Sequence, residues 1–208
     1  MKTADLKKLA PSRAEAEAAS RAAAERLREA AAQARLIDVA VATMGSPVGD
    51  LLLAVTPRGL AAIWFDDGDR QLLLDRLARE VSPRVLESPR ATDDVRRELD
   101  EYFAGRRTAF DLALDRRLMH PFAREVLTAI AKVGFGRVAT YGEIAKRLGK
   151  PSAARAVGAA LGSNPIPIVV PCHRVVGAGG KLTGYAGGLH RKEWLLTLEG
   201  WLPARLEL

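Results

Sequence analysis

Three short apolar runs joined by turn-forming residues constrain the first half of this chain more than any other feature. The runs are IDVAVATM, DLLLAV and LAAIWF, all between Ile37 and Phe65, and the pieces that join them are GSPVG and TPRG. Short apolar runs punctuated by Gly and Pro are typical of consecutive β-strands connected by tight turns. The pattern predicts an antiparallel meander, in which Trp64 and Phe65 are core residues.

Helical patterns follow the meander. Apolar residues recur at helical spacing at about 69–80 and 92–104, and FDLALD at 110–115 is a candidate further strand. We therefore expect residues 37–119 to form an N-terminal α+β domain, with an antiparallel sheet and helices. No catalytic constellation is evident in it.

The composition of residues 1–36 is different. The stretch 12–35 is rich in Ala, Glu and Arg, and Ser12 followed by Glu15 fits a capping box at the start of a helix. Leu27 is the only large apolar residue of that stretch, so the predicted helix has little surface with which to dock. We expect a loosely attached helical extension, which is either a solvated helix or a regulatory element.

The pattern changes again after His120 and Pro121. FAREVLTAIAKV has helical spacing, and TYGEIAKRLG and SAARAVGAALGSN predict two short helices joined by a tight turn. We expect a mainly helical C-terminal domain over 120–208 that contains a helix-turn-helix. The second of its two helices is nearly all Ala and Gly and carries one long cation, Arg155. Such a thin surface suits close approach to a DNA groove or tight packing inside a core.

The positive charge is concentrated in the same part. Residues 1–119 hold 20 Lys and Arg against 20 Asp and Glu, whereas residues 120–208 hold 12 against 5, so the whole net charge of +7 lies there. An anionic partner is therefore expected for the C-terminal part. No apolar run is long enough to cross a bilayer and no hydrophobic signal begins the chain, which predicts a cytoplasmic protein with no membrane partner.

The chain has one cysteine, Cys172, which ends the apolar run IPIVVP and precedes His173 and Arg174. One cysteine forms neither an intramolecular disulfide nor a thiolate-rich zinc cluster, so we expect no metal, and the sulfur is either a buried small hydrophobe or a nucleophile. A nucleophilic thiol needs a nearby cation, base or helix terminus that lowers its pKa. Adjacent side chains on an extended segment point in opposite directions, so a bridging water, rather than a direct ion pair, is expected between Cys172 and His173.

Four motifs of the C-terminal part belong together. They are Ser-Asn-Pro at 163–165, Pro-Cys-His-Arg at 171–174, Gly-Tyr-Ala-Gly-Gly at 184–188 and Lys-Glu-Trp-Leu-Leu at 192–196. In this order they closely resemble the O6-alkylguanine-DNA alkyltransferases, also called methylated-DNA–protein-cysteine methyltransferases. The resemblance covers residues 120–201 and, with weaker motifs, 37–119. It implies direct-reversal repair of DNA, in which one alkyl group moves irreversibly from O6-alkylguanine, with O4-alkylthymine as a further candidate, to the cysteine.

The resemblance also implies a role for each catalytic side chain. Cys172 is the nucleophile, His173 accepts its proton through a water, and Glu199 orients the imidazole. Asn164 ties the helix-turn-helix to the cysteine segment. Tyr141 assists the departure of guanine through its hydroxyl, and the alternative for that tyrosine is a packing role at a helix start.

DNA binding follows from the same resemblance. The damaged base is turned out of the duplex, and Arg155 enters from the minor groove and takes its place, with little sequence preference. The residues expected to contact DNA are Ser152, Ala153, Ala154, Arg155 and Tyr141, and those expected to line the base pocket are Leu161, Val175, Tyr185, Ala186 and Gly187. Ala186 stands where the family often has serine, a departure that bears on bulkier alkyl groups. We expect a monomer that needs no cofactor and associates with the nucleoid when bound to DNA.

Two other functions stay open on the sequence alone. A DNA-binding regulator would read sequence with the helix-turn-helix and use the cysteine as a sensor of alkylation or oxidation. A sequence reader needs Asn, Gln, Arg or Lys facing the bases, however, and this helix offers one Arg among alanines. The third interpretation is a globular domain with a buried, inert cysteine.

Overall fold

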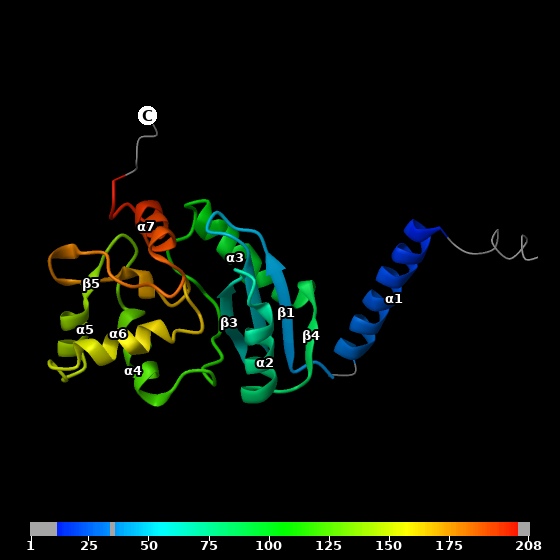
Figure 1. Cartoon of the computed structure of the whole chain (residues 1–208), viewed down its shortest axis with the longest axis horizontal. Helices are drawn as coiled ribbons and strands as arrows, with labels where there is room; N and C mark the ends of the chain where they lie inside the picture. The colour runs from blue at the N-terminus through cyan, green and yellow to red at the C-terminus, as the bar shows by residue number, and fades with distance from the viewer. Residues whose placement is uncertain (1–11, 34–35, 204–208) are drawn as a thin grey trace, which may run out of the picture. The chain divides into compact units, whose positions relative to one another are not determined.

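The computed structural model describes residues 12–33 and 36–203 (Figure 1). It divides after Ile37 into two compact units. The first unit holds helix α1 (Arg13–Gln33), which confirms the predicted helix. The predicted capping box is present, since the Ser12 N–H donates to Glu15 Oε2 at 2.8 Å and the Glu15 N–H donates to Ser12 Oγ at 3.3 Å. Leu27 is 67% exposed, as expected for a helix with no apolar face.

A four-stranded sheet begins the second unit. Its strands are β1 (Val39–Met44), β2 (Leu51–Thr56), β3 (Gly59–Phe65) and β4 (Val85–Glu87), in the spatial order β3-β2-β1-β4. β1, β2 and β3 form the predicted antiparallel meander. β4, which was not predicted from the sequence, pairs with β1 in parallel, so the sheet is mixed and adds one parallel strand to the antiparallel meander. The physical reason is the helix between β3 and β4, because a helical crossover returns the chain in the original direction.

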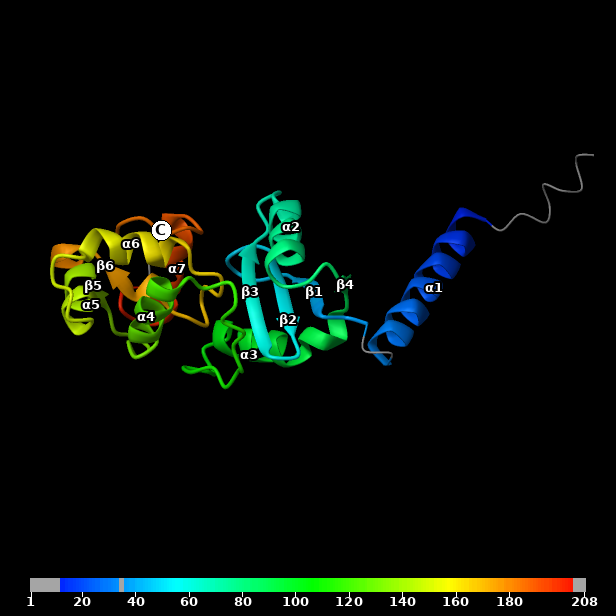
Figure 2. The same cartoon turned by 90° about the horizontal axis from the view of Figure 1, so that it is seen from below.

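Two helices cover this sheet. They are α2 (Arg70–Glu80) and α3 (Asp93–Phe103), which a short 3₁₀ helix, η1 (Pro89–Thr92), precedes, and both confirm the predicted helices. Figure 2 shows α2 and α3 on opposite sides of the strands. The segment 110–115 is not a strand, since Leu114 forms only an isolated bridge with Leu60.

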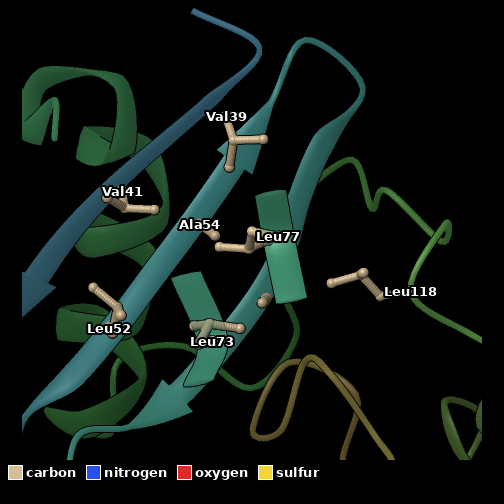
Figure 3. Packing of buried hydrophobic residues seen from close by; sticks show 8 residues of the cluster. Val39, Val41, Leu52, Ala54, Leu73, Leu77 and Leu118 are labelled. Carbon is tan, nitrogen blue, oxygen red and sulfur yellow. The ribbon is translucent and has the colours of Figure 1, made fainter. Parts of the chain in front are cut away.

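One hydrophobic cluster joins α2 to the sheet. Its buried members are Val39, Val41, Leu52, Ala54, Ala62, Leu73, Leu77 and Leu118. Figure 3 shows Leu73 and Leu77 of α2 facing the residues of β1 and β2. Each fully buried leucine contributes about 1.5–3 kcal/mol through removal of its apolar surface from water. This cluster fixes α2 on the sheet.

Short elements build the rest of the unit. In chain order they are α4 (Pro121–Ile130), β5 (Ala139–Thr140), α5 (Tyr141–Arg147), α6 (Ala154–Gly162), η2 (Cys172–Arg174), β6 (Val175–Val176), η3 (Ala178–Gly180) and α7 (Leu189–Leu198). We refer to residues 120–203 as the C-terminal part and to residues 38–119 as the N-terminal part. The domain division at 1–36, 37–119 and 120–208 stays a prediction.

The predicted pair of short helices is formed by α5 and α6. Thr140 starts α5 with a capping box, because its side chain accepts from the Glu143 N–H at 3.2 Å while Glu143 accepts from the Thr140 N–H. Gly149 follows α5 with a φ of +69°, a left-handed conformation that favours glycine and lets the chain turn toward α6. Within the described ranges, no helix has both the length and the apolar character that crossing a membrane requires.

Candidate active site

Cys172 lies at the start of the 3₁₀ turn η2, where it borders an open pocket of about 550 Å³. The expectation of an extended segment was therefore wrong for residues 172–174, since the backbone N–H of Arg174 donates to the Pro171 carbonyl at 3.0 Å and closes a turn. The residues that line the pocket with Cys172 are Tyr141, Ala154, Arg155, Gly158, Leu161, Gly162, Gly177, Thr183, Gly184, Tyr185 and Ala186. The sulfur is thus reachable from the helix-turn-helix side of the molecule.

The loop before Cys172 is held in a strained conformation. Ile168 is fully buried and has a φ of +73°, which no other non-glycine residue in ranges 12–33 and 36–203 shares. A β-branched residue in this region is energetically unfavourable and persists only when its surroundings enforce it. The Asn164 side chain supplies part of that enforcement, since its Oδ1 accepts from the Ile166 N–H at 3.0 Å and its Nδ2 donates to the Val170 carbonyl at 2.9 Å.

Asn164 also touches the sulfur. Its Nδ2 group donates to Cys172 Sγ at 3.1 Å. Burial raises the pKa of the Cys172 thiol, and the hydrogen bond from Asn164 and the positive charge of Lys192 act in the opposite direction. A buried thiol of this kind is protonated at neutral pH, so fast attack requires a base.

His173, the next residue in the chain, is a candidate base. The imidazole is fully buried, and its Nε2 atom lies 2.9 Å from Glu199 Oε1. Since an ionised carboxylate only accepts hydrogen bonds, Nε2 carries the hydrogen and Nδ1 keeps its lone pair. Nδ1 has no partner among the described residues. Burial lowers the pKa of His173, and Glu199 opposes this shift, so the ring is neutral and able to accept a proton at Nδ1.

Glu199 receives hydrogen bonds from several directions. Its Oε1 atom accepts from the Tyr102 hydroxyl at 2.7 Å and from Arg174 Nη2 at 2.9 Å, besides His173. Its Oε2 atom accepts from Arg174 Nε at 2.8 Å and from the Gly136 N–H at 3.3 Å. Burial alone would raise the pKa of Glu199, but its bonds to His173 and Arg174 lower it to about 2. The carboxylate is therefore ionised although it is buried.

Two residues of this network were missed by sequence reasoning. Tyr102 comes from α3 in the N-terminal part, and no pattern in the sequence links it to Glu199. Lys192 is 1% exposed, and its Nζ donates to the carbonyl oxygens of Val175 at 2.6 Å and Thr183 at 3.0 Å. Burial lowers the pKa of Lys192 to about 8. Its place in the Lys-Glu-Trp-Leu-Leu motif, one turn before two buried leucines, is a signal that could have identified it.

Tyr141 and Tyr185 stand on the walls of the pocket. The Thr183 hydroxyl donates to the Tyr141 hydroxyl oxygen at 3.1 Å, which leaves the phenol hydrogen of Tyr141 free to donate into the pocket. The Tyr185 hydroxyl is enclosed and has no partner among the described residues. Burial and the neighbouring Cys172 raise the pKa of Tyr185 well above its ordinary value, so the phenol stays protonated.

The structure separates some residues that were predicted together. Val175 is completely buried in β6 and is not among the residues that line the pocket, and Gly187 borders a second cavity of about 280 Å³ that also reaches Cys172. Of the predicted DNA contacts, Ala154 and Arg155 line the pocket with Tyr141. Ser152 is exposed on the turn before α6, and Ala153 is the half-buried N-cap residue of that helix.

Phe65 connects the N-terminal part to the glycine-rich wall of the pocket, by which we mean residues 184–188. Both of the predicted core residues at the end of β3 are half-buried, but Trp64 packs against the hydrophobic cluster of the sheet as expected, whereas Phe65 is not part of that cluster. The Phe65 ring meets the Tyr185 ring edge-on at 6.1 Å, and the guanidinium of Arg191 lies 4.6 Å from its centre. Arg191 in turn donates to the Gly187 carbonyl at 2.9 Å and pairs with Asp67 at 2.6 Å. The Phe65 ring packs against Tyr185 and Arg191 and not into the core of the sheet.

No three His, Cys, Asp or Glu side chains among the described residues lie close enough together to hold a metal ion. The polar side chains that line the pocket are the thiol of Cys172, the phenols of Tyr141 and Tyr185, the hydroxyl of Thr183 and the guanidinium of Arg155, while the imidazole of His173 is buried next to Cys172 in the chain. This donor set suits transfer of a group to sulfur with proton removal, and it offers no ligand cluster for a cofactor metal.

Comparisons with known proteins identify the same methyltransferase family in both parts of the chain. The model of the 6-O-methylguanine DNA methyltransferase ribonuclease-like domain matches residues 39–116, and that of the DNA binding domain of the same methyltransferase matches residues 121–201. A methylated-DNA–protein-cysteine methyltransferase of Methanosarcina acetivorans is 44% identical over 155 residues, which are 74% of this chain and 94% of the relative. The protein of the same name from Salmonella typhimurium is 46% identical over 173 residues, or 81% and 98%.

Solved structures that resemble this chain belong to methyltransferases of the same kind. The crystal structure of Mycobacterium tuberculosis O6-methylguanine methyltransferase has a TM-score of 0.69 at 41% identity and covers 80% of this chain and 96% of its own. The structure of Mycobacterium tuberculosis OGT in complex with DNA has a TM-score of 0.67 at 40% identity, with coverage of 79% and 96%.

Proposed function

This chain belongs to the 6-O-methylguanine DNA methyltransferase family, and we propose that it repairs DNA by drawing the alkyl group of an O6-alkylguanine onto Cys172. Its relatives are methylated-DNA–protein-cysteine methyltransferases, and the function is direct-reversal repair. The observation that carries the assignment to Cys172 is the chain of contacts behind the pocket, in which Asn164 donates to the sulfur and Glu199 holds the imidazole of the next residue.

The proton of the thiol leaves first in this proposal. His173 presents the lone pair of Nδ1, and a water between Sγ and Nδ1 carries the proton to the ring. The imidazolium that forms is stabilised by the ionised carboxylate of Glu199, which is already in contact with Nε2. The relay needs no direct bond between Cys172 and His173.

The sulfur then attacks the alkyl carbon. A bond forms between Sγ of Cys172 and this carbon while the bond from the carbon to O6 breaks, and the electron pair stays on the guanine. Tyr141 lowers the charge of the departing base by donating its phenol hydrogen toward a ring nitrogen, which its bond from Thr183 leaves free. The ring nitrogen takes up one proton, which balances the proton that the thiol gave to His173, and the products are a thioether on the protein and an unmodified guanine in the DNA.

Each molecule acts once, because a thioether is not hydrolysed under mild conditions. The substrate is double-stranded DNA, and the alkylated base is turned out of the stack into the pocket at a cost of a few kcal/mol. Arg155, exposed on α6 at the rim of the pocket, enters from the minor groove and fills the gap. We place the protein in the cytoplasm as a monomer that binds DNA with little sequence preference, needs no cofactor or metal, and loses affinity as salt rises.

A stoichiometric assay tests the proposal. A duplex with a single O6-methylguanine is titrated with the protein, and restored guanine is counted by cleavage with an enzyme that the lesion blocks. We expect one guanine restored per protein molecule and none with Cys172→Ser. Continued turnover, or repair by Cys172→Ser, would contradict a sacrificial cysteine.

A further inference from the structure

The carboxylate of Glu199 is shared between two parts of the chain that are distant in sequence. Tyr102 lies on α3, on the sheet of the N-terminal part, and Glu199 is the residue that ends α7. The Tyr102 hydroxyl reaches Glu199 Oε1 over 2.7 Å, and both side chains are buried. An element with no part in the pocket therefore contacts the residue that holds the imidazole of His173.

The direction of this hydrogen bond is fixed by chemistry. Burial and the negative charge of Glu199 raise the pKa of the Tyr102 phenol, so the phenol keeps its hydrogen and donates it to the carboxylate. The same Oε1 atom accepts from His173 Nε2 at 2.9 Å. Arg174 Nη2 also donates to this atom at 2.9 Å, so Tyr102, His173 and Arg174 share the electron density of one oxygen atom, and the charges of Arg174 and Lys192 act on His173 as well.

The ring of Tyr102 is held firmly. The Phe103, Phe110 and Phe135 rings lie 5.6, 5.3 and 6.2 Å from it, centre to centre. Phe110 is in the N-terminal part and Phe135 in the C-terminal part, so the ring is clamped where the two parts meet. A hydroxyl on such a ring has a fixed position, and its partner oxygen is fixed with it.

We propose that Tyr102 is a positioning residue for alkyl transfer: from the N-terminal part it fixes the carboxylate of Glu199, and through it the orientation and basicity of the imidazole that takes the proton of Cys172. This inference rests on the proposed function. It gives the N-terminal part a definite task in the chemistry, although that part contributes no atom to the transfer.

Removal of the phenol oxygen should change the pKa of His173 in a predictable direction. In Tyr102→Phe, Oε1 loses one donor, so its bond to His173 Nε2 becomes stronger and the imidazole becomes more basic. Burial keeps the pKa of His173 below its ordinary 6.5 in the native protein, so the variant moves it upward. The imidazole accepts a proton only when neutral, and the acid limb of the pH–rate profile therefore shifts to higher pH.

The test measures the rate of alkyl transfer from a lesion duplex as a function of pH. For Tyr102→Phe we expect an acid midpoint higher by on the order of half a pH unit and a plateau rate lower by about tenfold. Affinity for the lesion duplex, measured by titration with Cys172→Ser as the background, is unchanged. Phe103→Leu is the matched control, because it removes packing from the same ring but no hydrogen bond to Glu199.

A second variant guards against a folding defect. Replacement of Tyr102 with 4-aminophenylalanine keeps the ring and a weaker N–H donor, and it should shift the midpoint in the same direction by less. The inference is overturned if the midpoints of both variants equal that of the native protein, or if Phe103→Leu shifts it equally. If the native protein transfers no alkyl group at all, the proposed function fails, which is a different result from an unshifted midpoint.

Discussion

The amide of Asn164 joins two groups at once, donating from Nδ2 to the carbonyl oxygen of Val170 at 2.9 Å and to Sγ of Cys172 at 3.1 Å. The first bond holds the strained loop, and the second favours the ionised form of the sulfur. One side chain at the end of α6 therefore couples the position of the nucleophile to its reactivity.

Asn164→Ala should raise the pKa of Cys172, since the largest opposing effect to burial is lost. We expect transfer to slow by about tenfold or more, because a hydrogen bond to a charged group contributes roughly 1.5–3 kcal/mol. The rate of iodoacetamide labelling against pH measures the thiol directly. Ser163→Ala is the control, as its hydroxyl donates to the Ala160 carbonyl of α6. An unchanged labelling profile in Asn164→Ala would remove this role.

Lys192→Met should weaken both the fold and the reaction. The substitution leaves the carbonyl oxygens of Val175 and Thr183 without their donor, at a cost of about 1–3 kcal/mol each. It also removes a positive charge that lowers the pKa of Cys172. Urea unfolding and transfer rate are the measurements, with the exposed Lys181→Met as the matched variant. Transfer at the native rate in Lys192→Met would show that the sulfur does not sense this charge.

Arg155→Ala should impair the extrusion of the base from the duplex without impairing the transfer of the alkyl group. We expect repair of the lesion in duplex DNA to slow by tenfold to a hundredfold, since an extruded base costs a few kcal/mol to hold. Reaction with free O6-benzylguanine, which needs no extrusion, should keep its rate. The exposed Arg147 on α5 is the control cation, and Arg147→Ala should affect duplex repair less. Equal slowing with both substrates would contradict a role in filling the gap.

The stability of the protein should fall in acid in two steps. The pKa of His173 is lowered in the folded state, so the unfolded chain binds more protons below its ordinary pKa of 6.5 and stability declines there. The pKa of Glu199 falls from 4.5 to about 2 on folding, so its contribution of about 3 kcal/mol is present above 4.5 and is lost as pH falls toward 2.

Urea unfolding across this pH range measures both steps. In Glu199→Gln the decline between pH 4.5 and 2 should be shallower, because one titrating group is gone. The neutral-pH stability of this variant should also be lower, since Arg174 loses its buried partner. An unchanged acid slope in Glu199→Gln would show that this carboxylate does not titrate on unfolding.

Local patterns predicted most of the fold. The meander, α2, α3 and the two helices α5 and α6 all follow from apolar spacing and turn residues. The parallel strand β4 was not predicted, because a segment of three residues has no sequence pattern that indicates which strand it pairs with. The segment 110–115 was predicted as a strand but forms only an isolated bridge at Leu114. Alternating apolar residues do not by themselves provide a neighbouring strand with which to pair.

The sequence predicted those site residues that belong to a motif of the family. Cys172, His173 and Glu199 stood out through the resemblance, whereas Tyr102 meets Glu199 across 97 residues of sequence and only tertiary packing brings the two together. Phe65 was misjudged for a related reason. An aromatic residue at a strand end fits a core in the sequence, and its contact with Tyr185 depends on a loop more than a hundred residues later.

The most direct test of the central claim is the intact mass of the protein after incubation with a duplex that contains one O6-methylguanine, followed by peptide mapping. The account predicts a gain of one methyl group in place of one hydrogen, located on Cys172 and absent from Cys172→Ser. An unmodified thiol after prolonged contact with the lesion, or a methyl group on another residue, would contradict it.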